Sequence, residues 1–230
     1  MDDTETTAIP ILFQDEDLVA VVKPAGMMVH RSWGAARDEL FLLQAVSCQI
    51  GRYVYPVQRL DRNTSGVMVF ALSSEMAREI QATISTDAVV KEYLTLCRGT
   101  TDEAFIVERP LTASSGAKQA SRSDFRRLAT FSRCSLLAVR LHTGRKHQIR
   151  RHLSHLAHQI IGDSSYGKGR INAFFRETYG LPRMALHARR LSLPHPRTGE
   201  RLDFNEPLAD DLRAFLLRLP DVDRAVVESI

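Results

Sequence analysis

The chain has few cysteines and no long apolar run, and each of these shortages excludes some classes of protein. Its only cysteines, Cys48, Cys97 and Cys134, are odd in number, far apart and without C-x-x-C spacing. Neither a disulfide framework nor a cysteine-rich zinc site is therefore indicated, and a reducing compartment is expected. The first residues are acidic and no long apolar run follows them, so we expect neither a signal peptide nor a membrane span. These shortages predict a soluble, cytoplasmic protein.

A strong excess of one charge sign is also missing, but the charges are unevenly distributed. The 230 residues contain 31 Lys and Arg against 27 Asp and Glu, a formal net charge of +4. Residues 1–17 carry six acidic side chains and no basic one, a net charge of −6. Residues 118–151 carry ten basic side chains against Asp124 alone, a net charge of +9. This basic block is typical of a surface that binds nucleic acid, although it can also be a solvated arginine-rich face.

The length suits one elaborated domain, and 44% apolar and 25% charged residues are typical of a globular chain. Apolar spacing predicts strands near 9–13, 18–22, 67–72, 89–97, 135–141 and 184–193, and helices near 38–51, 73–84, 146–157, 172–178 and 210–217. Small polar residues at 112–123 predict a surface loop, and 196–199 predict a hairpin turn. Strands joined by hairpins and single helices indicate an α+β domain with a mixed, mostly antiparallel sheet flanked by helices.

Two patterns suggest a phosphate or metal site without completing one. Residues 162–168 match the first seven positions of a phosphate-binding loop, but Gly169 occupies the position that requires a metal-binding Ser or Thr. Five histidines lie within 142–158, yet no Cys, Asp or Glu accompanies them there, and the neighbouring Arg and Lys side chains oppose a dication. We therefore interpret the glycines as turn formers and expect no metal, with a metal- or nucleotide-dependent hydrolase as the alternative.

A dense polar segment, 58–66, separates two apolar runs and contains Asp61 between Arg59 and Arg62. The flanking positive charges favour the ionised carboxylate, as a nucleophile or base acting on an anionic substrate requires. The alternative for this motif alone is an aspartate that caps a turn in a surface loop.

Several motifs occur together and in a fixed order along the chain. They are Arg59-Leu60-Asp61-Arg62-x-Thr64-Ser65-Gly66, Lys91-x-Tyr93, Thr143-Gly144-Arg145-x-His147-Gln148-Ile149-Arg150, Gly162-Asp163 and Leu186-His187-Ala188. In this order, over about residues 11–207, the chain resembles the pseudouridine synthases of the RluA family. Lys23-Pro24-x-Gly26 and the segment 150–156 most resemble the tRNA pseudouridine synthase C branch. One departure is Gln58, where family members commonly carry His; Gln can hydrogen-bond but cannot titrate.

The resemblance implies a short acidic tail, 1–8, and a single pseudouridine synthase catalytic domain, 9–230, with no separate N-terminal RNA-binding domain. It implies an enzyme that isomerises a specific uridine to pseudouridine in structured RNA, with tRNA position 65, near the junction of the acceptor and T stems, as the expected target. Ribosomal RNA is the alternative target, and a non-catalytic RNA-binding factor is the remote alternative. We expect no cofactor, no nucleotide and no membrane partner, and a monomer.

The family pattern also implies residue roles. Asp61 is the expected catalytic residue, which attacks or deprotonates the ribose while the glycosidic bond breaks. The expected substrate-binding residues are Arg59, which fills the vacated base stack or holds a phosphate, Tyr93, which stacks on the uracil, Arg150, which pairs with Asp61, and Leu186, which packs on the other side of the base. The expected RNA phosphate contacts are Arg62, Arg145 and Lys146.

Overall fold

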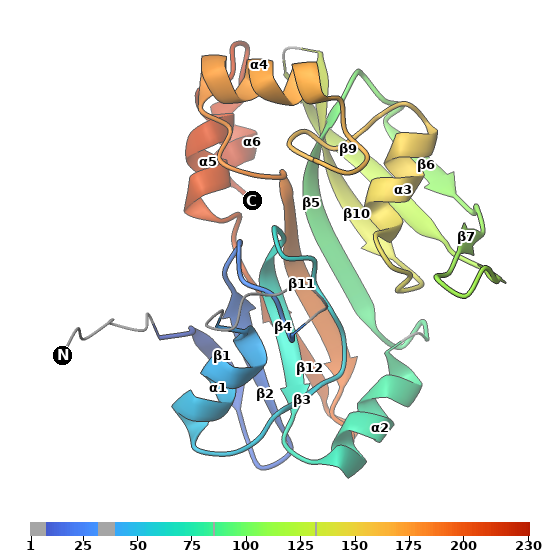
Figure 1. The fold of residues 1–230 in the computed structure, drawn as a ribbon, viewed down its shortest axis with the longest axis vertical. Coiled ribbons are helices and arrows are strands. Elements are labelled where there is room, and N and C mark those ends of the chain that lie inside the picture. The colour runs from blue at the N-terminus through green and yellow to red at the C-terminus, as the bar shows by residue number, and fades with distance from the viewer. Residues whose placement is uncertain (1–7, 32–39, 85, 132) are drawn as a thin grey trace.

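A computed structural model describes residues 8–31, 40–84, 86–131 and 133–230. Within them ten strands form one sheet, whose main path is β1-β2-β4-β11-β5-β10-β9-β6, with β12 beside β11 and β3 beside β4 (Figure 1). The strands are β1 (Ile11–Gln14), β2 (Leu18–Lys23), β3 (Tyr55–Pro56), β4 (Ser65–Ala71), β5 (Val90–Arg98), β6 (Ala104–Val107), β9 (Ser123–Phe131), β10 (Cys134–Leu141), β11 (Leu186–Pro194) and β12 (Arg201–Asn205). The β4–β11 pair is parallel and the other pairs of this sheet are antiparallel.

Helices cover both faces of the sheet (Figure 1). They are α1 (Leu42–Ile50), α2 (Ser74–Thr83), α3 (Gln148–His155), α4 (Gly169–Tyr179), α5 (Asp210–Leu216) and α6 (Arg224–Glu228). Apolar residues of α1 and α3 share one buried cluster with one face of the central strands. Those of α2 pack against the opposite face of β2 and β4, and those of α4, α5 and α6 against the opposite face of β5 and β10. The predicted single α+β domain with a mostly antiparallel sheet is confirmed.

Strand β4 shows how the sequence places the middle of the sheet. All seven of its residues are buried: Met68 and Phe70 belong to the cluster with α1 and α3, whereas Val67 and Val69 belong to the cluster with α2. A strand buried on both faces is expected to be a continuous apolar run. At its start, Gly66 has a φ of 114°, and a Cβ there would lie 2.1 Å from the carbonyl oxygen of Ala188. Glycine therefore permits the close approach of β4 to β11.

Most of the predicted elements are present with shifted ends. The predicted opening hairpin corresponds to β1 and β2, and the Ser73 hydroxyl caps α2 by accepting the N–H of Met76 at 3.1 Å. The predicted helix start at Asp38 lies outside the described residues, and α1 begins at Leu42 with Phe41 at its N-cap. Helix α3 begins two residues later than predicted because His147 has a left-handed φ of 55°.

Several elements were not predicted. Strands β3, β6 and β9 and helix α6 were missed, and β12 was implied only by the predicted hairpin turn at 196–199. The predicted loop at 112–123 overlaps a hairpin of β7 (Leu111–Thr112) and β8 (Lys118–Gln119). In β9 the adjacent Arg126 and Arg127 hide the alternation of buried and exposed positions, and the strand is held by pairing with β6 and β10 on its two sides. No helix in the described part of the chain is long and apolar enough to cross a membrane.

Candidate active site

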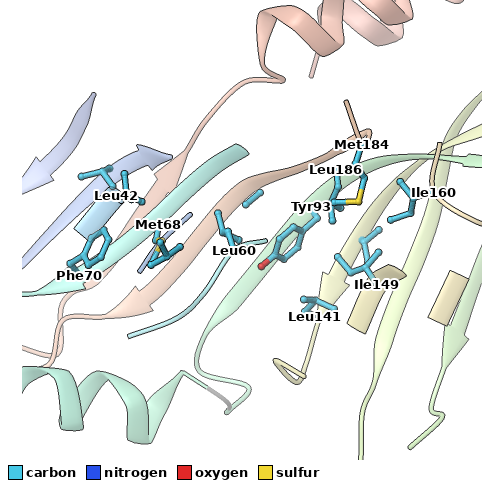
Figure 2. Packing of buried hydrophobic residues seen from close by; sticks show 14 of the residues in the cluster. Leu42, Leu60, Met68, Phe70, Tyr93, Leu141, Ile149, Ile160, Met184 and Leu186 are labelled. Atoms are coloured by element: carbon cyan, nitrogen blue, oxygen red, sulfur yellow. The ribbon is translucent and has the colours of Figure 1, made fainter. Parts of the chain in front are cut away.

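The loop between β3 and β4 carries the expected catalytic residue. Leu60 is buried in the same cluster as Tyr93 and anchors this loop to the core (Figure 2). The N–H of Thr64 donates to the carbonyl of Asp61 at 3.0 Å and closes a turn. The Asp61 side chain keeps 26% of its surface exposed, so a substrate can reach the carboxylate.

One cavity of about 470 Å³, open to solvent, collects most of the residues expected at the site. The expected residues that line it are Asp61, Arg59, Tyr93, Arg145, Arg150 and Leu186. They come from the loop before β4, from β5, from the segment that leads into α3, from α3 itself and from β11. Residues that are far apart in the sequence thus meet around one carboxylate.

Arg150 is a residue of α3, and its side chain contacts Asp61. Its Nη1 donates to Oδ2 of Asp61 at 2.8 Å, while its Nε and Nη2 donate to the two carboxylate oxygens of Asp163 at 2.7 and 2.8 Å. Burial by itself lowers the pKa of Arg150, but the hydrogen bonds with Asp163 and Asp61 outweigh burial and raise this pKa above its usual value. The guanidinium is therefore a fixed positive charge beside Asp61.

Asp163 orients Arg150 and was not among the site residues expected from the sequence. Its side chain is fully buried, and its Oδ1 also accepts the N–H groups of Ser165 and Tyr166 at 2.8 and 3.0 Å. Burial raises the pKa of Asp163, but the bonds from Arg150 and these N–H groups outweigh it and lower the pKa. The turn at 162–168 is thus built around its own carboxylate, which accepts the kind of N–H group that a phosphate-binding loop offers to its ligand. The sequence resemblance includes Gly162-Asp163 but assigns no role to Asp163.

His147 and Tyr166 complete the surroundings of Asp61, and neither was singled out as a site residue. The His147 Nε2 lies 3.5 Å from Oδ1 of Asp61, and its Nδ1 lies 3.2 Å from the Tyr166 hydroxyl. Burial lowers the pKa of His147 and outweighs the opposing effect of Asp61, so the ring is neutral at pH 7. The Tyr166 ring covers Arg150, whose guanidinium carbon lies 5.1 Å from the ring centroid. The motif that contains His147 could have indicated that residue as part of the site. Tyr166, its neighbour in space, belongs to none of the family motifs.

Tyr93 forms an aromatic wall of the cavity. Its ring lies among Leu60, Ile149 and Leu186, and only 9% of the residue is exposed (Figure 2). Burial, with a smaller effect of the Asp61 charge, raises the pKa of Tyr93 far above its usual range. Its hydroxyl therefore stays protonated at neutral pH and can donate a hydrogen bond.

The structure places Arg62 and Lys146 outside this cavity. The Nε of the exposed Arg62 donates to the carbonyl of Gly26 at 2.9 Å, which ties the catalytic loop to the end of β2. Lys146 is exposed and lines a neighbouring open hollow of about 1210 Å³, together with Arg59, Arg145 and Arg151. Because Arg59 and Arg145 line both spaces, the hollow continues the cavity along a basic wall.

The histidine-rich segment is divided among separate partners. His142 contacts Asp124, His152 contacts Ser121 and Ser123, and His158 contacts the carbonyl of Arg98. His155 contacts Arg109. In the described ranges, no group of three or more His, Cys, Asp or Glu side chains is arranged to hold a metal ion.

These features define an enzyme site for an anionic substrate with a flat ring, because a carboxylate held by a buried cation faces an aromatic wall and an arginine-rich hollow. The profile of the RNA pseudouridylate synthase family matches residues 17–155. Proteins named tRNA pseudouridine synthase C are similar: one from Vibrio cholerae is 41% identical, covering 84% of this chain and 88% of its own, and one from Yersinia pestis is 42% identical, covering 84% of each. The solved structure of human RNA pseudouridylate synthase domain containing 4 superimposes with a TM-score of 0.74 at 26% identity, covering 91% of this chain and 92% of its own.

The chain belongs to the RNA pseudouridylate synthase family. It is a pseudouridine synthase, an isomerase that acts on RNA, and the resemblance found in its sequence is confirmed.

Proposed function

We propose that this enzyme converts one uridine of tRNA, at position 65 near the junction of the acceptor and T stems, to pseudouridine. Relatives of about 40% identity carry the name tRNA pseudouridine synthase C. The observation that carries the catalytic part of the proposal is the shared cavity, in which Arg150 holds the Asp61 carboxylate. We further propose that the enzyme acts in the cytoplasm, as a monomer and without a cofactor, since substrate and product are isomers.

Asp61 is the catalytic group of this proposal. The uridine C–N glycosidic bond breaks, the uracil rotates while it is held, and its C5 bonds to the ribose carbon, while C5 loses a proton and N1 gains one. Asp61 either attacks the ribose carbon, in a bond that breaks again when C5 bonds there, or removes a ribose proton that it later returns. Arg150 stabilises the ionised carboxylate through Oδ2 at 2.8 Å. The neutral His147 lies 3.5 Å from the other carboxylate oxygen, so a neighbouring side chain orients each oxygen of Asp61 before the substrate binds.

The cavity accepts the uracil only when the nucleotide leaves its stack. Extrusion costs a few kcal/mol, which stacking and phosphate contacts offset. Tyr93 stacks on the extruded uracil from one side and Leu186 packs on the other, since both side chains line the cavity and belong to one apolar cluster. Arg59, at the boundary between cavity and hollow, fills the vacated stack or holds the adjacent phosphate.

The basic hollow binds the RNA backbone that flanks the target uridine. Arg145, Lys146 and Arg151 line it, and the β7–β8 hairpin contributes its other wall through Thr112 and Gln119. Three cations along a surface that leads into the catalytic cavity attract backbone phosphates and give salt-dependent affinity. Arg62, exposed on the catalytic loop, adds a further phosphate contact.

Pseudouridine mapping in a strain that lacks the gene tests this proposal. We expect one tRNA site, uridine 65, to lose its modification, and to regain it with the wild-type gene but not with Asp61→Asn. Asp203→Asn, which changes a half-exposed carboxylate on β12, is the matched control and should restore the site. Loss of a ribosomal RNA site instead would overturn the tRNA target. Restoration by Asp61→Asn would overturn the catalytic role of Asp61 and favour a binding function.

A further inference from the structure

Arg183 is a largely buried cation that does not line the catalytic cavity. It lies just before β11, its side chain is 9% exposed, and its guanidinium binds the Asp211 carboxylate of α5 through two hydrogen bonds of 2.6 and 2.9 Å. Helix α5 lies beside the start of β11 (Figure 1). A bidentate pair of this kind fixes the plane of the guanidinium.

The same guanidinium reaches both segments that carry the proposed site. Its Nη1 donates to the carbonyl of Asn63 at 3.2 Å and lies 3.4 Å from the carbonyl of Leu186, and its Nη2 donates to the Ser65 hydroxyl at 2.8 Å. Asn63 is two residues after Asp61 in the catalytic loop. One side chain thus sets the position of that loop relative to the first residue of β11.

The polar contacts continue beyond Ser65. Because the Ser65 oxygen accepts from Arg183, its proton is directed to Nδ1 of His187 at 2.9 Å, and the His187 Nε2–H then faces the carbonyl of Glu206 at 3.3 Å. Burial lowers the pKa of His187 to about 4, so the ring is neutral at pH 7 and can accept this proton. The series of donors therefore runs in one direction, from the Arg183 guanidinium to the Glu206 carbonyl.

A second basic side chain holds the loop from the side of β2. The Nζ of the fully buried Lys23 donates to the carbonyls of Arg62 and Thr64 at 3.0 and 2.9 Å, and burial lowers its pKa to about 7. Arg183 binds the carbonyl of Asn63, so the three successive carbonyls at 62–64 each accept a hydrogen bond from Lys23 or Arg183. The loop is therefore fixed at consecutive residues, and the direction in which it presents Asp61 follows from these bonds.

We propose that Arg183, oriented by Asp211, is a positioning residue for the reaction. It sets the distance between Asp61 and the wall formed by Leu186 without touching the substrate, and it makes the rate depend on a contact with α5. The proposal rests on the catalytic role given to Asp61 above. A displacement of about 1 Å at a reacting group can lower a rate about 100-fold, so a modest shift of this loop has a large effect.

The test measures the single-turnover rate of pseudouridine formation and the RNA affinity separately. The substrate is total RNA from the deletion strain, which contains tRNA and ribosomal RNA, so the measurement does not depend on which RNA is the target. Arg183→Lys keeps the positive charge but loses the planar guanidinium that makes the paired hydrogen bonds. Asp211→Asn removes the negative charge of the half-exposed partner and so weakens its hold on the guanidinium. We expect the rate to fall about 10- to 100-fold for Arg183→Lys and less for Asp211→Asn, with RNA affinity within about twofold of wild type.

The pair of Arg190 and Asp203 supplies the matched control. It is also bidentate, at 2.8 and 2.7 Å, and joins β11 to β12 away from the catalytic loop. Arg190→Lys and Asp203→Asn should keep the wild-type rate within about twofold. A further readout is chemical rescue: guanidinium chloride at non-denaturing concentration should restore part of the rate of Arg183→Ala, whereas the same concentration of potassium chloride should not.

Two results would overturn the inference. One is a rate within twofold of wild type for folded Arg183→Lys and Asp211→Asn, and the other is an equal loss in the Arg190 and Asp203 controls. If Arg183→Lys fails to fold, Asp211→Asn alone decides, because it leaves Arg183 in place and removes only the charge that orients its guanidinium. The proposed function fails on a different result, namely turnover by Asp61→Asn, which is read in the same assay.

Discussion

Replacing Arg150 by methionine should destabilise the fold as well as stop the reaction. The Arg150 guanidinium makes three charge-assisted hydrogen bonds of 2.7 to 2.8 Å, two to Asp163 and one to Asp61. Without it, the fully buried Asp163 carboxylate loses its counter-ion, and breaking a buried pair in this way costs about 3–5 kcal/mol. The N–H groups of Ser165 and Tyr166 still bind Asp163, so we expect a loss near the lower end, about 3 kcal/mol.

Companion substitutions separate charge burial from lost packing. Adding Asp163→Asn to Arg150→Met removes the unpaired charge and should recover at least about 1 kcal/mol. Asp61→Asn alone should cost less than about 1 kcal/mol, because this side chain is 26% exposed and its amide oxygen still accepts from Arg150. Arg190→Met, in an ion pair that is 34% and 39% exposed, should cost at most about 1 kcal/mol.

Urea unfolding followed by circular dichroism measures these free energies, and pseudouridine formation on RNA from the deletion strain measures activity. Arg150→Met should lose both stability and activity, whereas Asp61→Asn should lose activity alone. The reasoning fails if Arg150→Met unfolds within about 1 kcal/mol of wild type, or if adding Asp163→Asn recovers nothing.

Three further predictions concern single side chains. Tyr93→Phe should keep RNA affinity and the packing of the ring, and lose at most the contribution of the hydroxyl to the rate, as single-turnover kinetics would show. Lys146→Ala should weaken RNA binding and reduce the slope of log affinity against log salt by about 1, because one phosphate contact is lost; an unchanged slope in a filter-binding titration would argue against that contact. For His187, whose pKa burial lowers to about 4, the unfolded chain takes up a proton below pH 6.5 while the folded chain does not. Stability should therefore be complete above pH 6.5 and fall by up to about 3 kcal/mol as the pH falls towards 4, and His187→Gln should show a smaller fall in thermal melts.

Local sequence signals predicted the elements that are held by their own apolar pattern. The opening hairpin, β4, β5, β10 and β11 are short apolar runs bounded by turns, and most of the helices carry apolar residues at helical spacing. Strand β9 escaped prediction because pairing with β6 and β10 stabilises it, and the β7–β8 hairpin escaped because its strands are only two residues long and pair with each other. His147 shortened α3 because its left-handed backbone is compatible with the turn before the helix and not with the helix.

The residues of the candidate site were likewise only partly predictable from the sequence. The motifs around Asp61, Tyr93 and Arg150 could be recognised because each is a local run of characteristic residues. Tyr166 and Arg183 stand in no such run, and their importance follows from contacts with residues 16 to 120 positions away. No spacing rule in a single sequence reports such contacts.

The sequence by itself determined the class of fold, the basic block and the chemistry that the motifs around Asp61 imply, because propensity, charge and motif order are properties of the chain. Only the tertiary structure decided which charges neutralise which. It gave Arg150 a second, buried partner in Asp163, placed Arg183 behind the catalytic loop and left Lys146 on the wall of the hollow. The physical reason is that the strength of an ion pair depends on distance and burial, and both are fixed only when distant segments pack together.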